Sequence, residues 1–222
     1  MALAERAPAR VATGRVRRFG RTERALHWLS AAAFASLTLT GLVLWLPFLA
    51  TLVNDRPLMK AIHLWSAGGL AAGIVAIVVL GDRRSLRRTA RQVDRFDRHD
   101  RAWLAGAPRR AVRGGEAPPA GRFNAGQKLN AVIITAAWIL FAVSGSFLWL
   151  GERDHTFQLG GMLFLHDALT LATLPLVLGH VYMAALNPRT TGSLEGMTHG
   201  TVDRDWAQRH HPRWDPDDDA AS

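Results

Sequence analysis

Residues 162–186 read MLFLHDALTLATLPLVLGHVYMAAL, and Asp167 is the one charged side chain among them. A helix needs about 20 apolar residues to cross the hydrocarbon of a bilayer. Three further blocks of this kind cover residues 25–48, 61–81 and 129–150. Pro175 lies inside the quoted block, where neighbouring helices can satisfy the carbonyl that proline leaves unpaired, so we expect one continuous, kinked helix. The sequence therefore predicts an all-α integral membrane protein with a four-helix transmembrane bundle.

The aromatic residues and the composition favour a membrane protein over a soluble one. Four buried helices of a soluble domain are the alternative interpretation of the blocks. Tryptophans lie near block ends, where a membrane interface attracts them, at Trp28, Trp45, Trp65 and Trp149. The 222-residue chain is 49% hydrophobic and contains no cysteine. The missing thiols exclude disulfides, cysteine-held iron–sulfur clusters and c-type haem attachment, so a redox centre here needs histidine or methionine ligands.

Basic residues predict the orientation of the chain. It carries 27 Lys and Arg against 18 Asp and Glu, and nearly all the basic residues lie outside the blocks. Residues 1–24 hold seven arginines and residues 82–127 are dense in arginine, whereas the two short connections hold three basic residues together. Because basic loops stay in the cytoplasm, we expect a cytoplasmic segment 1–24, a membrane domain 25–187 whose loop 82–127 is cytoplasmic, and a cytoplasmic tail 188–222.

The concentration of Lys and Arg in cytoplasmic segments also accounts for the formal charge of +9, so we expect membrane lipid and no nucleic acid as a partner.

The loop 82–127 begins as a basic amphipathic segment, which either lies on anionic lipid or is an ordinary cytoplasmic loop. No removable signal is evident before Ala25, so the first block is expected to direct insertion. We find no internal repeat.

Four of the nine histidines fall inside the blocks: His27, His63, His166 and His180. An ionisable residue that faces lipid is costly, so each is a candidate site residue facing the bundle interior. His27 and His63 also allow an interfacial reading, with one nitrogen in water. His166 and His180 are 14 residues apart, which places them on one helix face and about 21 Å apart in depth.

The predicted orientation groups these histidines into two pairs. His27 and His180 lie toward the cytoplasmic side, and His63 and His166 toward the outer side. Neutral imidazoles that arrive from facing helices suit the two axial positions of a low-spin haem iron. Two haems b, one bound by each pair, would use every histidine within the spans.

Other uses of these residues need different partners. A single zinc or copper site cannot join histidines about 21 Å apart. A proton relay would bring acids into the spans, where Asp167 alone lies, either as an outer partner of His166 or as a helix cap. Small residues on the helices either let a flat macrocycle approach or serve close helix packing, at Gly41, Gly68, Gly69, Gly73, Ser144, Gly145 and Gly179.

Four motifs carry a resemblance to a known family. They are FGRTERALHWL (19–29), RFNAGQKLN (122–130), HDALTLATLPLVLGHVYMAALNP (166–188) and GSLEGMTHGTVDRDWAQRHHPRW (192–214). With them the chain, from Arg18 onward, resembles the gamma subunit (cytochrome b subunit) of membrane-bound respiratory formate dehydrogenase, within the wider di-haem cytochrome b group. NAGQK and HHPRW are the most specific segments.

The resemblance implies a four-helix anchor in the bacterial inner membrane with two haems b, bound by the same four histidines. It implies electrons taken from an iron–sulfur (beta) subunit, which serves a molybdenum or tungsten formate-oxidising (alpha) subunit. Electrons would pass from the outer to the inner haem and on to menaquinone or ubiquinone, with protons taken from the cytoplasm. No catalytic residue for formate oxidation is expected in this chain.

The family's quinone pocket falls here on Asn124, Gly126 and Gln127, beside His180. An amide pair and exposed backbone suit a quinone carbonyl, and Lys128 adds positive charge. The alternative is that Asn124 only caps the third span.

Two other functions stay open from the sequence. The chain could be the cytochrome b subunit of a nickel–iron hydrogenase or of another molybdenum oxidoreductase. It would then carry electrons in the same way but receive them from a different partner. It could also be a non-redox membrane protein, which would bind no haem.

Overall fold

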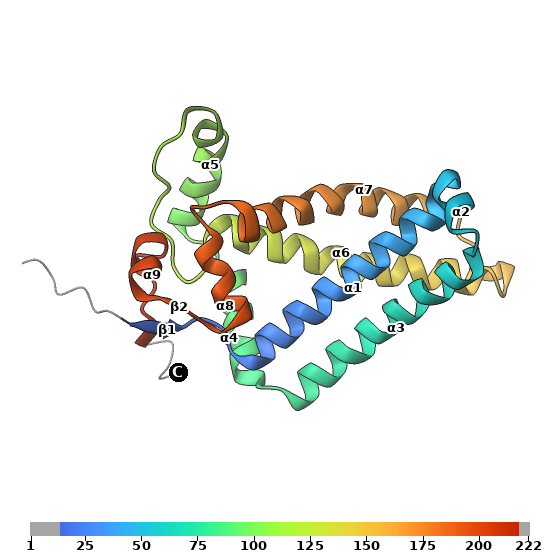
Figure 1. Cartoon of the computed structure of the whole chain (residues 1–222), viewed down its shortest axis with the longest axis horizontal. Coiled ribbons are helices and arrows are strands. Elements are labelled where there is room, and N and C mark those ends of the chain that lie inside the picture. Colours follow the sequence, from blue (N-terminus) through green and yellow to red (C-terminus); the bar gives the residue numbers. More distant parts are fainter. Residues whose placement is uncertain (1–13, 218–222) are drawn as a thin grey trace, which may run out of the picture.

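Four long helices form the body of the molecule (Figure 1). The computed structural model describes residues 14–217, so residues 1–13 of the predicted basic segment and 218–222 of the predicted tail lie outside it. The long helices are α1 (Arg21–Trp45), α3 (Arg56–Leu80), α6 (Ala125–Gly151) and α7 (Met162–Val181). Each is long and apolar enough to cross a membrane, α7 together with the helical turn that follows it. A membrane bundle of four helices is therefore confirmed.

Proline ends the first span earlier than we expected. The predicted block ran to residue 48, but α1 ends at Trp45 and Leu46 is extended. Pro47 then begins a separate short helix, α2 (Pro47–Val53). Proline lacks the N–H that a continuing helix needs, yet it suits the first position of a new one. At its other end α1 begins at Arg21, four residues before the predicted block.

Two of the other long helices, α3 and α6, begin before the predicted first residue, and α7 begins at it. α3 begins at Arg56 rather than at residue 61, because Asp55 caps it by accepting a hydrogen bond from Leu58 N (2.9 Å). α6 begins at residue 125 rather than 129. α7 is continuous through Pro175, as expected, and passes into a π-helical turn, η2 (Tyr182–Leu186).

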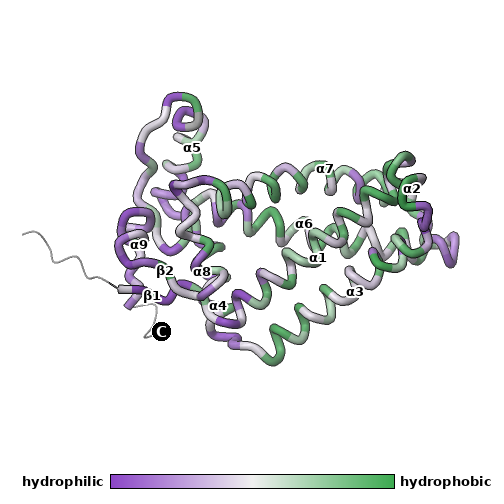
Figure 2. Tube along the Cα trace, viewed as in Figure 1, coloured by the Kyte–Doolittle hydropathy of each residue, from purple (hydrophilic) through white to green (hydrophobic). Residues whose placement is uncertain are grey.

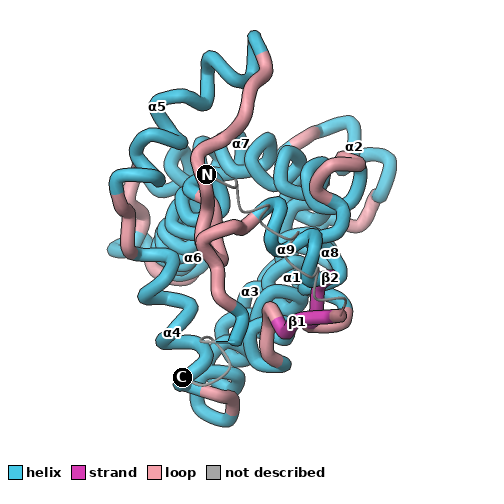
Figure 3. The backbone as a smooth tube through the Cα atoms, turned by 90° about the vertical axis from the view of Figure 1, so that its left-hand side faces the viewer, coloured by secondary structure: helices cyan, strands magenta, loops and turns pink. Residues whose placement is uncertain are grey.

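The remaining elements gather mostly at one end of the bundle and form what we call the cap. They are β1 (Arg15–Arg17), α4 (Arg83–Asp94), α5 (Arg98–Arg113), η3 (Thr191–Ser193), α8 (Leu194–Thr198), β2 (Thr201–Asp203) and α9 (Arg204–His210). Seen end-on in Figure 3, they lie across the ends of the long helices. We call the opposite end, which holds α2 and the short helix η1 (His155–Phe157), the hairpin end.

The described residues bury their hydrophobic cluster in the cap rather than between the spans. β1 and β2 pair antiparallel with Val16 opposite Val202, and both valines pack with Ala207. Trp206 and Trp214 cover this cluster. Along the long helices most apolar side chains are instead exposed, and Figure 2 shows this hydrophobic band between two hydrophilic ends. That distribution matches a bundle surrounded by lipid.

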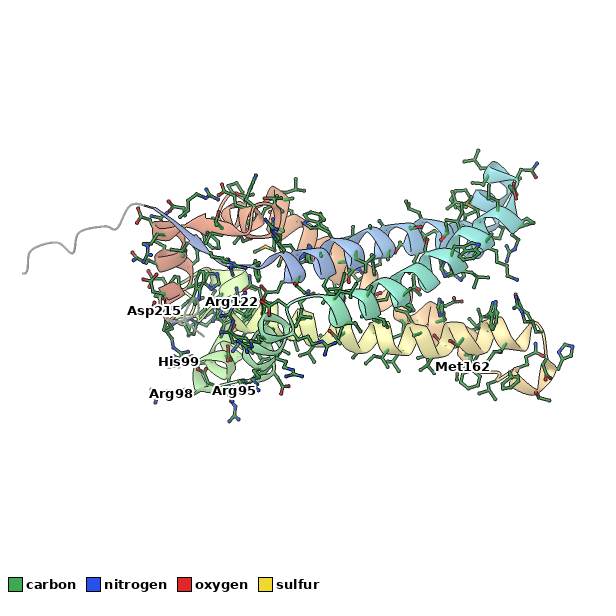
Figure 4. All side chains as sticks on the ribbon, turned by 90° about the horizontal axis from the view of Figure 1, so that it is seen from below. Arg95, Arg98, His99, Arg122, Met162 and Asp215 are labelled. Atoms are coloured by element: carbon green, nitrogen blue, oxygen red, sulfur yellow. The ribbon has the colours of Figure 1, made fainter. Side chains whose placement is uncertain are left out.

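A buried ion pair joins three distant segments inside the cap. Arg122, which Figure 4 labels, lies 2.9 Å from the Glu23 carboxylate, and both side chains are at most 5% exposed. Arg122 also donates to the Arg18 carbonyl, to Thr89 Oγ1 and to Gln92 Oε1. The pair thus connects the start of α1, the helix α4 and the segment before α6.

Arg18 extends this network toward the tail. Its guanidinium lies over the rings of Phe19, Trp206 and Trp214, at 5.1 to 5.8 Å from their centroids. It donates to His211 Nε2 (2.9 Å), while His211 Nδ1 donates to the Gly121 carbonyl (2.7 Å). Burial, and then the charge of Arg18, lowers the pKa of His211 to about 3, so this imidazole is neutral at neutral pH.

Candidate functional site

The four histidines within the spans meet as two pairs on different helices. His27 of α1 lies beside His180 of α7, with ring centroids 6.1 Å apart and an interplanar angle of 55°. His63 of α3 lies beside His166 of α7, with centroids 6.3 Å apart and an angle of 58°. The first pair lies near the cap and the second near the hairpin end, so we call them the cap-end pair and the hairpin-end pair. These are the two pairings expected from the sequence.

The spacing within each pair fits two imidazoles on one metal ion. An imidazole nitrogen binds a metal ion at about 2 Å and lies about 1 Å from its ring centroid, so two opposed rings have centroids about 6 Å apart. Both observed distances match this value. Within the described residues no group of three or more His, Cys, Asp or Glu could hold a metal ion. A pair of axial ligands without further protein ligands is what a haem needs.

Hydroxyl groups orient both rings of the hairpin-end pair. Thr40 Oγ1 of α1 lies 2.9 Å from His63 Nδ1, and Ser144 Oγ of α6 lies 2.9 Å from His166 Nδ1. Thr40 is 6% exposed and Ser144 is fully buried. With Nδ1 bonded to a hydroxyl, the Nε2 atom of each ring is the nitrogen available to iron.

Glycines next to these hydroxyls lie against the same rings. A Cβ on Gly41 would lie 3.5 Å from His63 Cε1, and a Cβ on Gly145 would lie 3.5 Å from His166 Cε1. The two glycines thus contact an imidazole, a role we did not expect. Gly73 serves helix packing, because a Cβ there would meet the Leu29 side chain at 2.6 Å. At Gly68, Gly69 and Gly179 a Cβ would meet nothing within 4 Å.

The cap-end pair has a different surrounding. His27 Nδ1 is buried and has no hydrogen-bond partner within the described residues. The ring packs edge-on against Trp28, with centroids 5.2 Å apart. The indole N–H of Trp28 in turn donates to the Met197 carbonyl of α8 (2.9 Å). The cap therefore contacts the residue beside this pair directly.

The structure gives the predicted quinone residues a capping role. Asn124 Oδ1 accepts from Gln127 N (2.9 Å), and Gln127 Oε1 accepts from Asn124 N (3.0 Å), so the two form a capping box at the start of α6. Gly126 allows close packing by Trp103 of α5, whose ring would lie 2.8 Å from a Cβ. No hydrogen bond or ring contact within the described residues joins this segment to His180.

The structure bears on two expectations about charged groups. The positive charge of Lys128 is paired, because its largely buried ammonium donates to Asp100 Oδ2 (2.7 Å) and to the Arg95 carbonyl (2.8 Å). Asp167 does not cap the fourth span, since the cap of α7 is Gly161. Among the described residues Asp167 forms neither a hydrogen bond nor an ion pair.

Comparison with known proteins places the chain in a family. Formate dehydrogenase, nitrate-inducible, cytochrome b556(Fdn) subunit of Escherichia coli K12 is 29% identical over 200 residues, which cover 86% of each chain. Formate dehydrogenase, cytochrome b556 subunit of Haemophilus influenzae is 25% identical over 199 residues, 86% of this chain and 78% of the relative. The E. coli K12 cytochrome b556(fdo) subunit is 25% identical over 203 residues, 89% and 90% of the two chains. The prokaryotic cytochrome b561 family matches residues 18–200, which include both histidine pairs, and the chain therefore belongs to this family of haem b proteins.

Proposed function

We propose that the chain is the membrane cytochrome b subunit of a formate dehydrogenase complex and carries electrons between a partner subunit and membrane quinone. The observation that supports this most is the presence of two histidine pairs, each spaced for one metal ion, at opposite ends of a four-helix membrane bundle. The relatives reported above are formate dehydrogenase cytochrome b556 subunits, which favours this complex over a hydrogenase.

Each pair would hold one haem b through the Nε2 atoms of its two imidazoles. The proposed ligands are His27 with His180 and His63 with His166. Haem iron, when bound, supplies a one-electron carrier at each of two depths. The chain's own contribution is to fix these depths, because His166 and His180 lie on one continuous helix with a rise of about 21 Å between them.

The proposed quinone site is the start of α6 together with His180. The capping box uses the carbonyl oxygens of Asn124 and Gln127, and it leaves both carboxamide NH₂ groups without a hydrogen bond to the described residues. An NH₂ group is the donor that a quinone carbonyl requires. The capping and quinone-binding interpretations of these residues are thus compatible. Menaquinone and ubiquinone both carry such carbonyls, and Gly126 lies between the two amides, packed against the Trp103 ring.

The proposed orientation places the cap in the cytoplasm and the hairpin end outside, in the bacterial inner membrane. Arginines concentrate in the cap, whereas Arg56, Lys60 and Arg153 are the basic residues of the two hairpin-end connections. This asymmetry is the normal signal for the cytoplasmic side. An iron–sulfur subunit and a molybdenum or tungsten catalytic subunit would then deliver electrons at the hairpin-end pair, on the outer side.

The test is haem quantitation with a reduced-minus-oxidised spectrum on the purified complex. We expect two haems b per chain in the wild type and one in His180→Ala and in His63→Ala. His155→Ala is the matched control, because His155 is an exposed histidine at the hairpin end, and it should keep both haems. Formate should reduce the wild-type haems, and quinone reduction should be lost in His180→Ala.

Each other outcome has a defined meaning. No haem in the wild type would refute the electron-transfer function and favour a non-redox membrane protein. Two haems in either variant would refute the ligand assignment. Haems that hydrogen reduces and formate does not would identify a hydrogenase subunit instead.

A further inference from the structure

We propose that Thr40 and Ser144 are positioning residues that fix the tautomer of the hairpin-end histidines and lower the redox potential of the haem bound there. The inference rests on the proposed function, because it concerns how this chain tunes two carriers of the same type. Neither residue would touch the iron. Each acts on a ligand from the neighbouring helix, through the nitrogen that faces away from the metal.

Backbone carbonyls of the same helix lie within hydrogen-bond distance of both hydroxyls, and this contact sets the direction of the bonds to histidine. Thr40 Oγ1 lies 2.7 Å from the Ser36 carbonyl, and a carbonyl can only accept, so the hydroxyl proton is donated there. The oxygen is then an acceptor toward His63, whose Nδ1 must carry the hydrogen. Ser144 repeats this arrangement, with Oγ 2.8 Å from the Leu140 carbonyl and 2.9 Å from His166 Nδ1.

The same device occurs in two separate helix hairpins. In the first, Thr40 and Gly41 of α1 face His63 of α3, and in the second, Ser144 and Gly145 of α6 face His166 of α7. The two segments read TGLVLW (40–45) and SGSFLW (144–149), so the sequence carries the same short pattern in both spans. A hydroxyl that served only to hydrogen-bond a carbonyl of its own helix would not be expected to lie at the same distance from a histidine in both hairpins.

The cap-end pair lacks this device. The buried Nδ1 of His27 has no partner, and His180 forms no hydrogen bond within the described residues. Donation from Nδ1–H to an oxygen makes an imidazole a more basic ligand, which stabilises ferric over ferrous iron. The hairpin-end site is therefore expected to have the lower potential of the two. This difference favours electron flow from the hairpin end toward the cap, the direction required for quinone reduction beside His180.

The test is a potentiometric titration of both haems in the purified complex. Thr40→Val keeps the shape of the side chain and removes the hydroxyl acceptor of His63, which leaves the Leu37 carbonyl beside the ring. Ser144→Ala removes the hydroxyl acceptor of His166. Loss of one hydrogen bond should change the ferric-to-ferrous equilibrium by about tenfold, which is about 59 mV upward for one electron. The shift should appear in the lower-potential haem alone. In His180→Ala the remaining haem is the one bound by the hairpin-end pair, so its potential shows which step of the wild-type titration belongs to that pair.

Matched controls separate this effect from a general disturbance of the helices. Thr38→Val and Ser146→Ala make the same substitutions two residues away, at side chains that lack a hydrogen bond to a histidine, and they should leave both potentials unchanged. Thr40→Ser keeps the hydroxyl and should retain the wild-type value. If Thr40→Val lost its haem, the inference would still be tested by a raised potential in Ser144→Ala and a wild-type potential in Thr40→Ser.

The results distinguish this inference from the proposed function. A wild type without haem would refute the function itself. Two intact haems with unchanged potentials in Thr40→Val and Ser144→Ala would refute the inference alone. Equal shifts in both haems, or the same shift in the controls, would also refute it, because the hydroxyls contact one pair only.

Discussion

Replacing Arg122 with alanine should open the cap, because it strands a buried carboxylate. Glu23 is only 5% exposed at its side chain and lies 2.9 Å from Arg122, which also donates to the Arg18 carbonyl and to Thr89. Removing one partner of a buried ion pair typically costs about 3–5 kcal/mol. That cost corresponds to an increase in the open fraction of the cap of between about 10² and 10⁴-fold.

The absence of cysteine from the sequence makes this increase measurable. Ala207 is 2% exposed inside the hydrophobic cluster of the cap, so a cysteine placed there reacts with a maleimide only when the cap opens. Arg122→Ala should raise the labelling rate in proportion to the open fraction. The matched control is Arg213→Ala, which breaks the exposed ion pair with Asp97 (2.8 Å). That pair contributes at most about 1 kcal/mol, which limits the change to about fivefold.

A second substitution tests the physical cause. Glu23→Gln in the Arg122→Ala background removes the stranded charge, so the double variant should label more slowly than Arg122→Ala alone. Equal labelling rates for Arg122→Ala and Arg213→Ala would show that the buried pair does not stabilise the cap. A double variant that labels faster than the single one would show that lost packing, rather than an uncompensated charge, causes the opening.

Two further predictions concern the cap. Because the pKa of His211 is about 3 in the folded cap and about 6.5 when unfolded, stability should be full above pH 6.5 and fall by up to about 1.4 kcal/mol per pH unit below it. His211→Gln should flatten this dependence when thermal midpoints are compared at pH 7.5 and pH 5. Gly200→Ala should destabilise the cap by roughly 1–3 kcal/mol, since its φ is +87° and a Cβ would lie 2.8 Å from the Phe19 carbonyl. Cysteine labelling at position 207 measures this loss, and an unchanged rate would contradict it.

The spans could be predicted because their signal is local. Some 20 consecutive apolar residues have few alternatives to a membrane helix, so all four were found. Their ends could not be predicted equally well. Arg21 and Glu23 are polar and resemble a loop, yet they are helical because Glu23 accepts from Gly20 N and pairs with Arg122, which is distant in sequence. Pro47 was read as part of a span, although its missing N–H ends one helix and starts another.

The candidate site likewise contains residues that the sequence predicts and residues that it does not. The histidine pairs followed from two sequence rules, the cost of an ionisable group in lipid and the positive-inside bias, which assign each histidine a depth. Thr40 and Ser144 were not found as partners of histidine, because a hydroxyl in a span is common and its bond to the next helix depends on rotation about the helix axis. The repeated segment around Gly41 and Gly145 was the signal that could have revealed them.

The cap helps to keep the long helices in register, since few apolar side chains of the described residues are fully buried between them. Apolar side chains gain little from leaving lipid for a helix interface, so packing alone specifies the depth of each span weakly. Glu23 and Arg122 join the start of α1 to the segment before α6, and Trp28 and Arg24 of α1 donate to the Met197 and Thr198 carbonyls of α8. The beginnings of two spans and the tail helix α8 are thereby held together in the cap. His27 and His180 meet near the cap, and the 14 residues between His166 and His180 then carry the register to the hairpin-end pair.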